Sequence, residues 1–292
     1  MSIHCLPPPL PPSVQVRSVW ADNIESEFSL IRSIIDRYPL ISMDTEFPGI
    51  VVRPDAEDPY NRYRDPKSHY MNLKANVDML NLIQVGLTLA NEEGNLPDLG
   101  TNNKYGFIWE FNFCDFDVTR DAHAHDSVEM LRSQGIDFER NREFGIDSVK
   151  FAELMMTSGL VLNDSVSWVS FHGAYDFGYL IKCLTQRVLP VELTEFLKLV
   201  RVYFGSGAVY DVKYMIRFCD LHGGLDRVGK ALGVHRVVGK KHQAGSDSLL
   251  TLHAFQMLKE KHFKDKDEGK LDKFSSFCLW KWVYRCTHHF GF

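Results

Sequence analysis

Two carboxylates, Asp44 and Glu46, stand two residues apart in a short apolar segment at 40–46. This segment is predicted to form a buried strand, which the Phe-Pro-Gly sequence at 47–49 ends. Side chains at positions i and i+2 of a strand leave the same face, so both carboxylates point in one direction. Like charges so close together repel and resist burial. Because a divalent cation relieves such repulsion, we interpret the pair as half of a metal site.

Two further carboxylates and a histidine stand where helices are predicted to begin. Asp176 lies in the first turn after the strand predicted at 167–171, and Asp247 lies just after Gly245 and Ser246. A helix N-terminus favours an ionised carboxylate. His242 precedes Asp247 by five residues, and a turn can aim both at one point. Taken singly, Asp176 is better explained as a first-turn or capping residue and His242 as a surface loop residue.

A fifth acid, Asp211, ends a predicted strand, and we prefer to interpret it as the N-cap of the following helix. The remaining four acids lie at the ends of strands in one sheet or at the starts of the helices on its faces. Such hard oxygen donors suit Mg²⁺ or Mn²⁺. Paired cations of this kind stabilise the attacking and leaving oxygens in phosphoryl displacement. A neutral histidine beside them could deprotonate the attacking water.

The amino-acid composition limits the classes of function that the chain can have. The chain has 292 residues, is 45% hydrophobic and 24% charged, and carries a net charge of −5. These values are ordinary for a globular protein and argue against an open electrostatic binder of duplex DNA. A narrow cleft in which metal ions neutralise phosphates stays compatible with them. The six cysteines are scattered, which favours reduced thiols in an intracellular protein. We expect neither a signal peptide nor a membrane span.

The elements that position these residues follow from hydrophobic periodicity. Strands at 82–89 and 105–113 are predicted to form an antiparallel hairpin, and 53–68 is predicted to be a loop. Helices are predicted at 23–38, 69–79, 126–134, 148–158, 175–186, 191–204, 212–218, 224–232 and 245–262. A strand at 208–211 is also predicted. A meander followed by strand-helix alternation indicates a single α/β domain, with a mixed sheet and helices on both faces.

Three segments together resemble one enzyme family. They are Met43-Asp-Thr-Glu-Phe-Pro-Gly49, Phe171-His-Gly-Ala-Tyr-Asp-Phe-Gly-Tyr-Leu180 and His242-Gln-Ala-Gly-Ser-Asp-Ser-Leu-Leu-Thr251. In this order they resemble the Caf/Pop deadenylases, catalytic subunits of the Ccr–Not complex, in the His-containing branch of the DEDD exonuclease superfamily. The resemblance runs from about residue 15 to 263 and implies a ribonuclease-H-like fold.

The resemblance also implies roles. Asp44, Glu46 and Asp247 would bind a first Mg²⁺ or Mn²⁺, Asp44 would bridge to a second, and Asp176 would support the second. His242 would be the general base. The implied activity is 3′–5′ shortening of mRNA poly(A) tails with release of 5′-AMP. The implied partners are the Not scaffold and a Ccr-type nuclease, and the implied location is the cytoplasm and nucleus.

Other interpretations stay open. The chain could be a general 3′–5′ exonuclease on RNA or single-stranded DNA, because chemistry at the metals does not read the base. It could also be a scaffold subunit, although the complete acid set disfavours this. Phe47 and His172 flank the acids and could stack on or wedge a terminal base. Core packing or turn structure explains both residues at least as well.

The chain ends differ in composition from the centre. Residues 1–14 are predicted to be a Pro-rich disordered tail, 15–263 the exonuclease domain, and 264–292 an atypical linker and aromatic tail. The tail contains Cys278, Cys286, His288 and His289, but their spacing fits no standard zinc site, and chance composition is preferred. Every proposed catalytic residue precedes the tail, so we expect 264–292 to be dispensable for catalysis.

Overall fold

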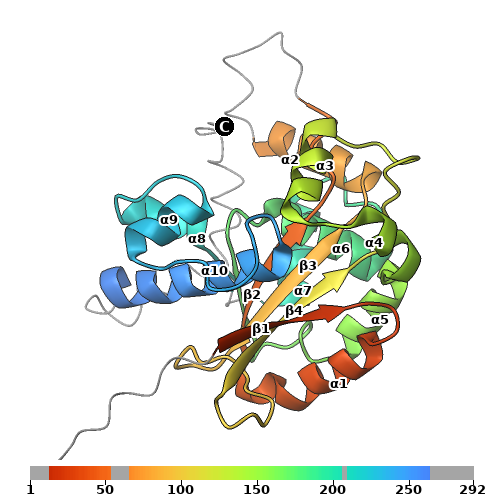
Figure 1. Cartoon of the computed structure of the whole chain (residues 1–292). Helices are drawn as coiled ribbons and strands as arrows, with labels where there is room; N and C mark the ends of the chain where they lie inside the picture. The colour runs from red at the N-terminus through yellow and green to blue at the C-terminus, as the bar shows by residue number, and fades with distance from the viewer. Residues whose placement is uncertain (1–12, 54–65, 206–208, 264–292) are drawn as a thin grey trace, which may run out of the picture.

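A six-stranded mixed sheet forms the centre of the computed structural model, which describes residues 13–53, 66–205 and 209–263 (Figure 1). The strand order is β1-β4-β3-β2-β5-β6. Pairing is antiparallel along β2, β3 and β4, whereas β1, β5 and β6 run parallel to their neighbours. The predicted meander and hairpin are therefore confirmed. The strands are β1 (Ser13–Val19), β2 (Leu40–Glu46), β3 (Gln84–Ala90), β4 (Tyr105–Asn112), β5 (Ser167–Ser170) and β6 (Val209–Asp211).

The helices follow the predicted order, and most bounds differ from the prediction by a few residues. Helix α2 begins three residues earlier than predicted, and the seven-residue α4, capped by the side chain of Asp137, was not predicted. The helices are α1 (Ile24–Ile34), α2 (Pro66–Met79), α3 (His125–Gln134), α4 (Phe138–Phe144), α5 (Ser148–Thr157), α6 (Ala174–Thr185), α7 (Leu193–Phe204), α8 (Val212–Met215), α9 (Leu225–Leu232) and α10 (Ala244–Leu258).

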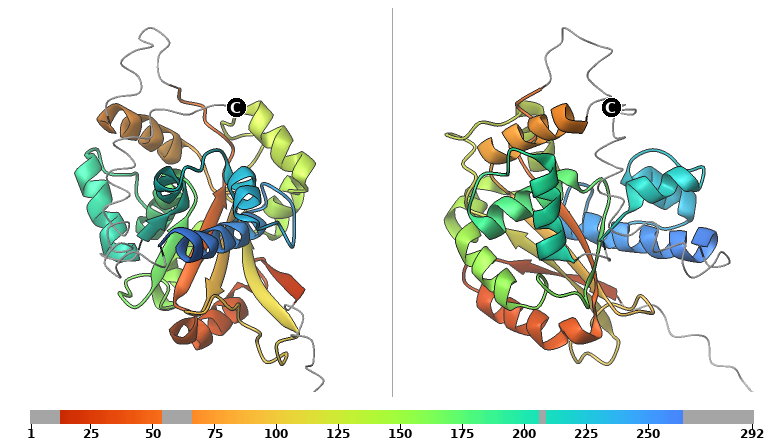
Figure 2. Two further views of the ribbon diagram at one scale, coloured as in Figure 1. Left: turned by 90° about the vertical axis from the view of Figure 1, so that its left-hand side faces the viewer. Right: turned by 180° about the vertical axis from the view of Figure 1, so that it is seen from behind.

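Helices cover both faces of the sheet (Figure 2). Helix α10 crosses one face over β2 and β3, and α9 packs against α10. The α1, α5 and α6 layer covers the other face, where the rings of Phe28, Phe111 and Phe151 have centroids 5.1–5.7 Å apart. Full burial of each such side chain contributes about 1.5–3 kcal/mol. The predicted α/β fold with a single mixed sheet is thus confirmed.

The side chains of β2 alternate between an apolar face and a polar face of the strand. Ile41 and Met43 are buried in the larger core, whereas the Ser42 hydroxyl donates a 2.8 Å hydrogen bond to the Ser248 carbonyl of α10. Asp44 and Glu46 share the face of Ser42, since strand side chains alternate. The two carboxylates therefore point toward the side on which α10 lies.

Gly86 lets the start of α10 approach the sheet beside these acids. In the β2–β3 register Gly86 is paired with Asp44. A Cβ atom at Gly86 would lie 1.9 Å from the carbonyl oxygen of Ala244, the first residue of α10. Glycine is needed because the helix backbone occupies the place of a side chain. This contact brings the first turn of α10, with Asp247, over the end of β2.

The domain begins two residues earlier than predicted. Strand β1 begins at Ser13, so Ser13 and Val14 belong to the sheet and not to the Pro-rich tail predicted at 1–14. They pair with β4 in parallel register, a contact that local composition does not reveal. Residues 1–12 and the predicted tail at 264–292, with its candidate zinc residues, lie outside the described residues.

Cys114, Cys183 and Cys219 are free thiols within the part of the chain that the structure describes. In the same part, no helix combines the length and the apolar character that crossing a bilayer requires.

Candidate active site

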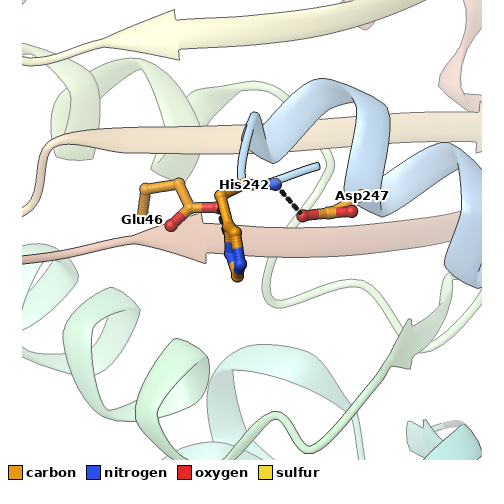
Figure 3. A group of neighbouring side chains, drawn as sticks. All are labelled: Glu46, His242 and Asp247. Atoms are coloured by element: carbon orange, nitrogen blue, oxygen red, sulfur yellow. Dashed lines mark hydrogen bonds and ion pairs between the residues drawn. The ribbon is translucent and has the colours of Figure 1, made fainter. Parts of the chain in front are cut away.

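Glu46, His242 and Asp247 meet at the end of β2, although about two hundred residues separate Glu46 from the other two (Figure 3). One ligand atom from each lies within 4.8 Å of the others. The His242 Nδ1 atom is 3.9 Å from Oε1 of Glu46, and the His242 backbone N–H donates a 2.8 Å hydrogen bond to Oδ2 of Asp247. The structure thus brings Glu46 of the 43–49 segment together with His242 and Asp247 of the 242–251 segment.

A strained turn aims the His242 side chain at the site. His242 has a φ of +59°, in the left-handed region that non-glycine residues seldom adopt. The turn is closed by the Gln243 side chain, whose Oε1 accepts a 2.8 Å hydrogen bond from the Lys240 N–H, and by the bond from His242 to Asp247. Strained backbone of this kind persists only where surrounding contacts hold it, and it is frequent at functional sites.

Asp176 approaches the same strand end from α6. Its Oδ1 atom accepts hydrogen bonds from the backbone N–H of Thr45 at 2.8 Å and from the Thr45 hydroxyl at 2.6 Å. Thr45 is the residue between Asp44 and Glu46. The Asp lies in the first turn of α6, as predicted, but Gly173 occupies the cap position. Its carboxylate therefore serves to join α6 to β2.

Burial and neighbouring carboxylates raise the pKa of the two acids on β2. Burial raises the pKa of Asp44 and Glu46 well above the usual range, and the charges of Asp247 and Asp176 raise both further. Burial also raises the pKa of Asp176 to about 7. Asp44 and Glu46 therefore both lie within electrostatic reach of Asp176 and Asp247. A buried group of repelling hard oxygen donors fits Mg²⁺ or Mn²⁺.

Two charged residues of the site were not predicted from the sequence. Arg236, in the loop after α9, donates to Oδ1 of Asp247 at 2.5 Å. Glu110 of β4 accepts a 3.2 Å hydrogen bond from the Gly245 N–H, and burial raises its pKa. The signal for Glu110 is a lone acid within the apolar sequence Ile-Trp-Glu-Phe at 108–111. The sequence holds no comparable signal for Arg236.

His172 lies in the turn between β5 and α6 with a φ of +69°. The Asp211 carboxylate shapes this turn by accepting hydrogen bonds from the N–H groups of His172 at 3.2 Å and Gly173 at 2.9 Å. The same carboxylate accepts from the Tyr214 N–H at 3.1 Å, so the predicted N-cap role of Asp211 is confirmed. Burial lowers the pKa of the His172 imidazole to about 4, with a smaller effect from the charge of Lys213.

Phe47 is half-buried against aromatic residues of α6. Its ring stacks on Tyr175, with centroids 5.3 Å apart and an angle of 20°, and packs on Tyr179 at 4.8 Å. The packing interpretation therefore accounts for this side chain. A contact of Phe47 or His172 with a terminal base stays a prediction.

The arrangement of strands and helices recurs in a solved exonuclease. The structure matches Escherichia coli exonuclease I solved with a dT13 oligonucleotide, with a TM-score of 0.51 over 77% of this chain and 42% of that chain. At 13% identity, this likeness defines the fold class alone. It agrees with the ribonuclease-H-like fold expected from the sequence.

Sequence comparison identifies the family. Residues 19–154 match the CAF1 family ribonuclease model. Probable CCR4-associated factor 1 homolog 7 of Arabidopsis thaliana is 52% identical over 264 residues, 90% of this chain and 92% of the relative. The poly(A) ribonuclease Pop2 of Schizosaccharomyces pombe is 43% identical over 262 residues, 88% of this chain and 72% of the relative. The chain therefore belongs to the CAF1 ribonuclease family.

Two solved structures of relatives agree with this assignment. S. pombe Pop2p in its Mg²⁺- and Mn²⁺-bound form has a TM-score of 0.79 and 41% identity, covering 89% of this chain and 97% of that chain. The yeast CAF1 structure obtained with the NOT1 MIF4G domain has a TM-score of 0.72 and 33% identity, covering 93% and 98%.

Proposed function

We propose that this protein is a 3′–5′ exoribonuclease that shortens mRNA poly(A) tails by phosphodiester hydrolysis and releases 5′-AMP. The observation that carries the proposal is the meeting of Glu46, His242 and Asp247 at the end of β2, where Asp176 also bonds Thr45, the residue between Asp44 and Glu46. Membership of a family that contains a poly(A) ribonuclease supports the choice of substrate.

The four carboxylates would hold two divalent cations, Mg²⁺ or Mn²⁺. Asp44, Glu46 and Asp247 would bind the first, and Asp44 and Asp176 the second. Bound cations of this kind stabilise the charge on attacking and leaving oxygens in phosphoryl displacement. The solved Mg²⁺- and Mn²⁺-bound form of Pop2p supports this metal choice. The protein contributes a buried, preformed set of oxygen donors whose mutual repulsion a cation relieves.

His242 would accept the proton of the attacking water. Burial lowers the pKa of its imidazole, so the ring is neutral at physiological pH and has a nitrogen free of a proton. Its Nδ1 atom lies 3.9 Å from a Glu46 oxygen, at the edge of the acid cluster. A general base must stand within reach of the proton it removes, and the left-handed turn at His242 supports that placement.

The two alternative functions suggested by the sequence, a general exonuclease and a scaffold subunit, have less support. A general exonuclease rests on the likeness to exonuclease I, which extends to the fold alone. A scaffold without catalysis does not account for this group of repelling acids, which are costly to bury without a function.

Product analysis tests the proposal. RNA labelled at its 5′ end and carrying a 3′ poly(A) tract would be incubated with wild-type protein and with Asp44→Asn, in parallel with poly(U) and single-stranded DNA. The expected result is a ladder shortened by single nucleotides, release of 5′-AMP, and loss of activity in EDTA or in the variant. Full activity in EDTA, or cleavage of a circular RNA, would contradict the proposal. Equal rates on all three polymers would favour the general exonuclease.

The proposal extends to partners and location. The yeast CAF1 structure with the NOT1 MIF4G domain supports binding of this chain to a Not scaffold, and the family name of its relatives supports a Ccr-type nuclease as second partner. The test is a pull-down from cell extract with Asp44→Ala as bait, in which absence of both subunits would contradict complex membership. We also infer a cytoplasmic and nuclear location, which imaging of a fluorescent fusion would test.

A further inference from the structure

Arg236 makes four polar contacts although only 15% of its side chain is exposed. One terminal nitrogen, Nη1, donates to the Ser246 hydroxyl at 2.6 Å and to the Lys240 carbonyl at 3.3 Å. The other, Nη2, donates to Oδ1 of Asp226 at 2.9 Å and to Oδ1 of Asp247 at 2.5 Å. The guanidinium therefore lies at a junction of α9, the loop that carries His242, and the first turn of α10.

This junction fixes the carboxylate of Asp247 at both oxygens. Arg236 binds Oδ1, and the His242 backbone N–H binds Oδ2. The charges of Asp44 and Glu46 repel the same carboxylate. A planar guanidinium with donors in a fixed fork opposes that repulsion and sets the direction of the carboxylate at the same time. The His242 loop is held too, because Lys240 is a partner of the same group.

We propose that Arg236 is a positioning residue that holds Asp247 and the His242 loop in their metal-binding arrangement. This inference rests on the proposed function, since it assigns a role toward the cations of that site. Arg236 contacts the proposed ligand Asp247, so its effect on a bound cation would pass through that carboxylate. Residues that orient metal ligands in this way typically change metal affinity or activity by about 10–100-fold when removed.

If Arg236 only stabilised the fold, a different result would be expected. Arg236 also joins α9 to α10 through Asp226, so its removal would lower the melting temperature in either case. If the joint were its entire role, folded Arg236→Gln protein would bind Mn²⁺ as the wild type does. Direct Mn²⁺ binding therefore separates the two roles, and it does not depend on turnover.

The experiment measures Mn²⁺ dissociation constants by calorimetry and kcat and KM on poly(A), for wild type, Arg236→Gln and Arg236→Lys. We expect the Gln variant to bind Mn²⁺ about 10–100-fold more weakly, with a lower kcat and little change in KM. The Lys variant should fall between the two, because lysine keeps the charge and loses the fork.

Arg17→Gln is the matched control. Arg17 of β1 also pairs with a buried carboxylate, Glu27, through two hydrogen bonds of 2.6 and 2.7 Å, but away from the acid cluster. Its substitution should lower the melting temperature and leave Mn²⁺ affinity unchanged. This result separates loss of a buried ion pair from loss of ligand orientation.

Each possible result of these measurements either supports or overturns the positioning role of Arg236. A folded Arg236→Gln protein with wild-type Mn²⁺ affinity would overturn it. If the Gln variant does not fold, the Lys variant serves, and unchanged affinity there would overturn the inference equally. A wild-type protein that binds no Mn²⁺ would instead contradict the proposed function itself, which distinguishes the two failures.

Discussion

Thr45 donates two hydrogen bonds to a single oxygen of Asp176, one from its backbone N–H at 2.8 Å and one from its hydroxyl at 2.6 Å. The residue between the two acids of β2 thus orients a third acid from α6. Thr45→Val removes the hydroxyl and keeps the β-branched shape. We expect kcat/KM on poly(A) and Mn²⁺ affinity to fall by about 10-fold, and Thr45→Ser to restore both. Equal activity of the Val and Ser variants would show that the hydroxyl has no such role.

Asp44→Asn should abolish turnover and stabilise the metal-free protein at neutral pH. Burial and neighbouring carboxylates raise the folded-state pKa of Asp44 well above 3.8. The folded state then binds more protons than the unfolded state above that pH, so stability falls as pH rises. In EDTA, the melting temperature of the wild type should fall more than that of the variant as the pH is raised above 3.8. Equal falls in both proteins would contradict the assignment.

His242→Ala should slow hydrolysis by about 10²–10⁴-fold, the usual contribution of a general base. Mn²⁺ binding should persist, because the oxygen donors of Glu46 and Asp247 remain in place. Single-turnover kinetics and calorimetry on the same preparation provide both values. Loss of Mn²⁺ binding would show that the imidazole is a metal ligand, an arrangement that the 4.8 Å grouping of these three residues permits.

His172 should make the protein less stable in mild acid. Its pKa is about 4 in the folded state, against 6.5 ordinarily. Between these values the unfolded state binds more protons, so this residue's contribution to stability is lost as pH falls from about 6.5 to 4. His172→Asn, which tolerates the left-handed turn, should show a smaller fall of melting temperature over that interval. An unchanged fall would mean that other groups cause it.

Much of the fold was predictable because its signals are local. The apolar segment of β2, the helical periodicity of α6 and the Gly-Ser start of α10 are readable from neighbouring residues. Strand β1 was missed because its pairing partner, β4, lies about ninety residues further along the chain. Seven residues with alternating polar positions, directly after a Pro-rich run, do not specify a strand without that partner.

The site was predictable to a similar extent and for a related reason. Motif order and strand alternation predicted that the four acids would converge, and in the structure Asp176 and Asp247 both act electrostatically on Asp44 and Glu46. The role of Thr45 was not predictable, because its hydroxyl contacts a residue 131 positions away. Arg236 was missed because loop geometry decides where a long, flexible side chain reaches, and residue spacing does not define that geometry.

The most direct test of the site is the location of bound metal. Crystals soaked in Mn²⁺ would be measured near the manganese absorption edge. The proposed mechanism predicts two anomalous peaks about 3.5–4 Å apart, among the carboxylates of Asp44, Glu46, Asp176 and Asp247, and their loss in Asp44→Asn. Manganese bound elsewhere, or an empty acid cluster at saturating Mn²⁺, would contradict the account.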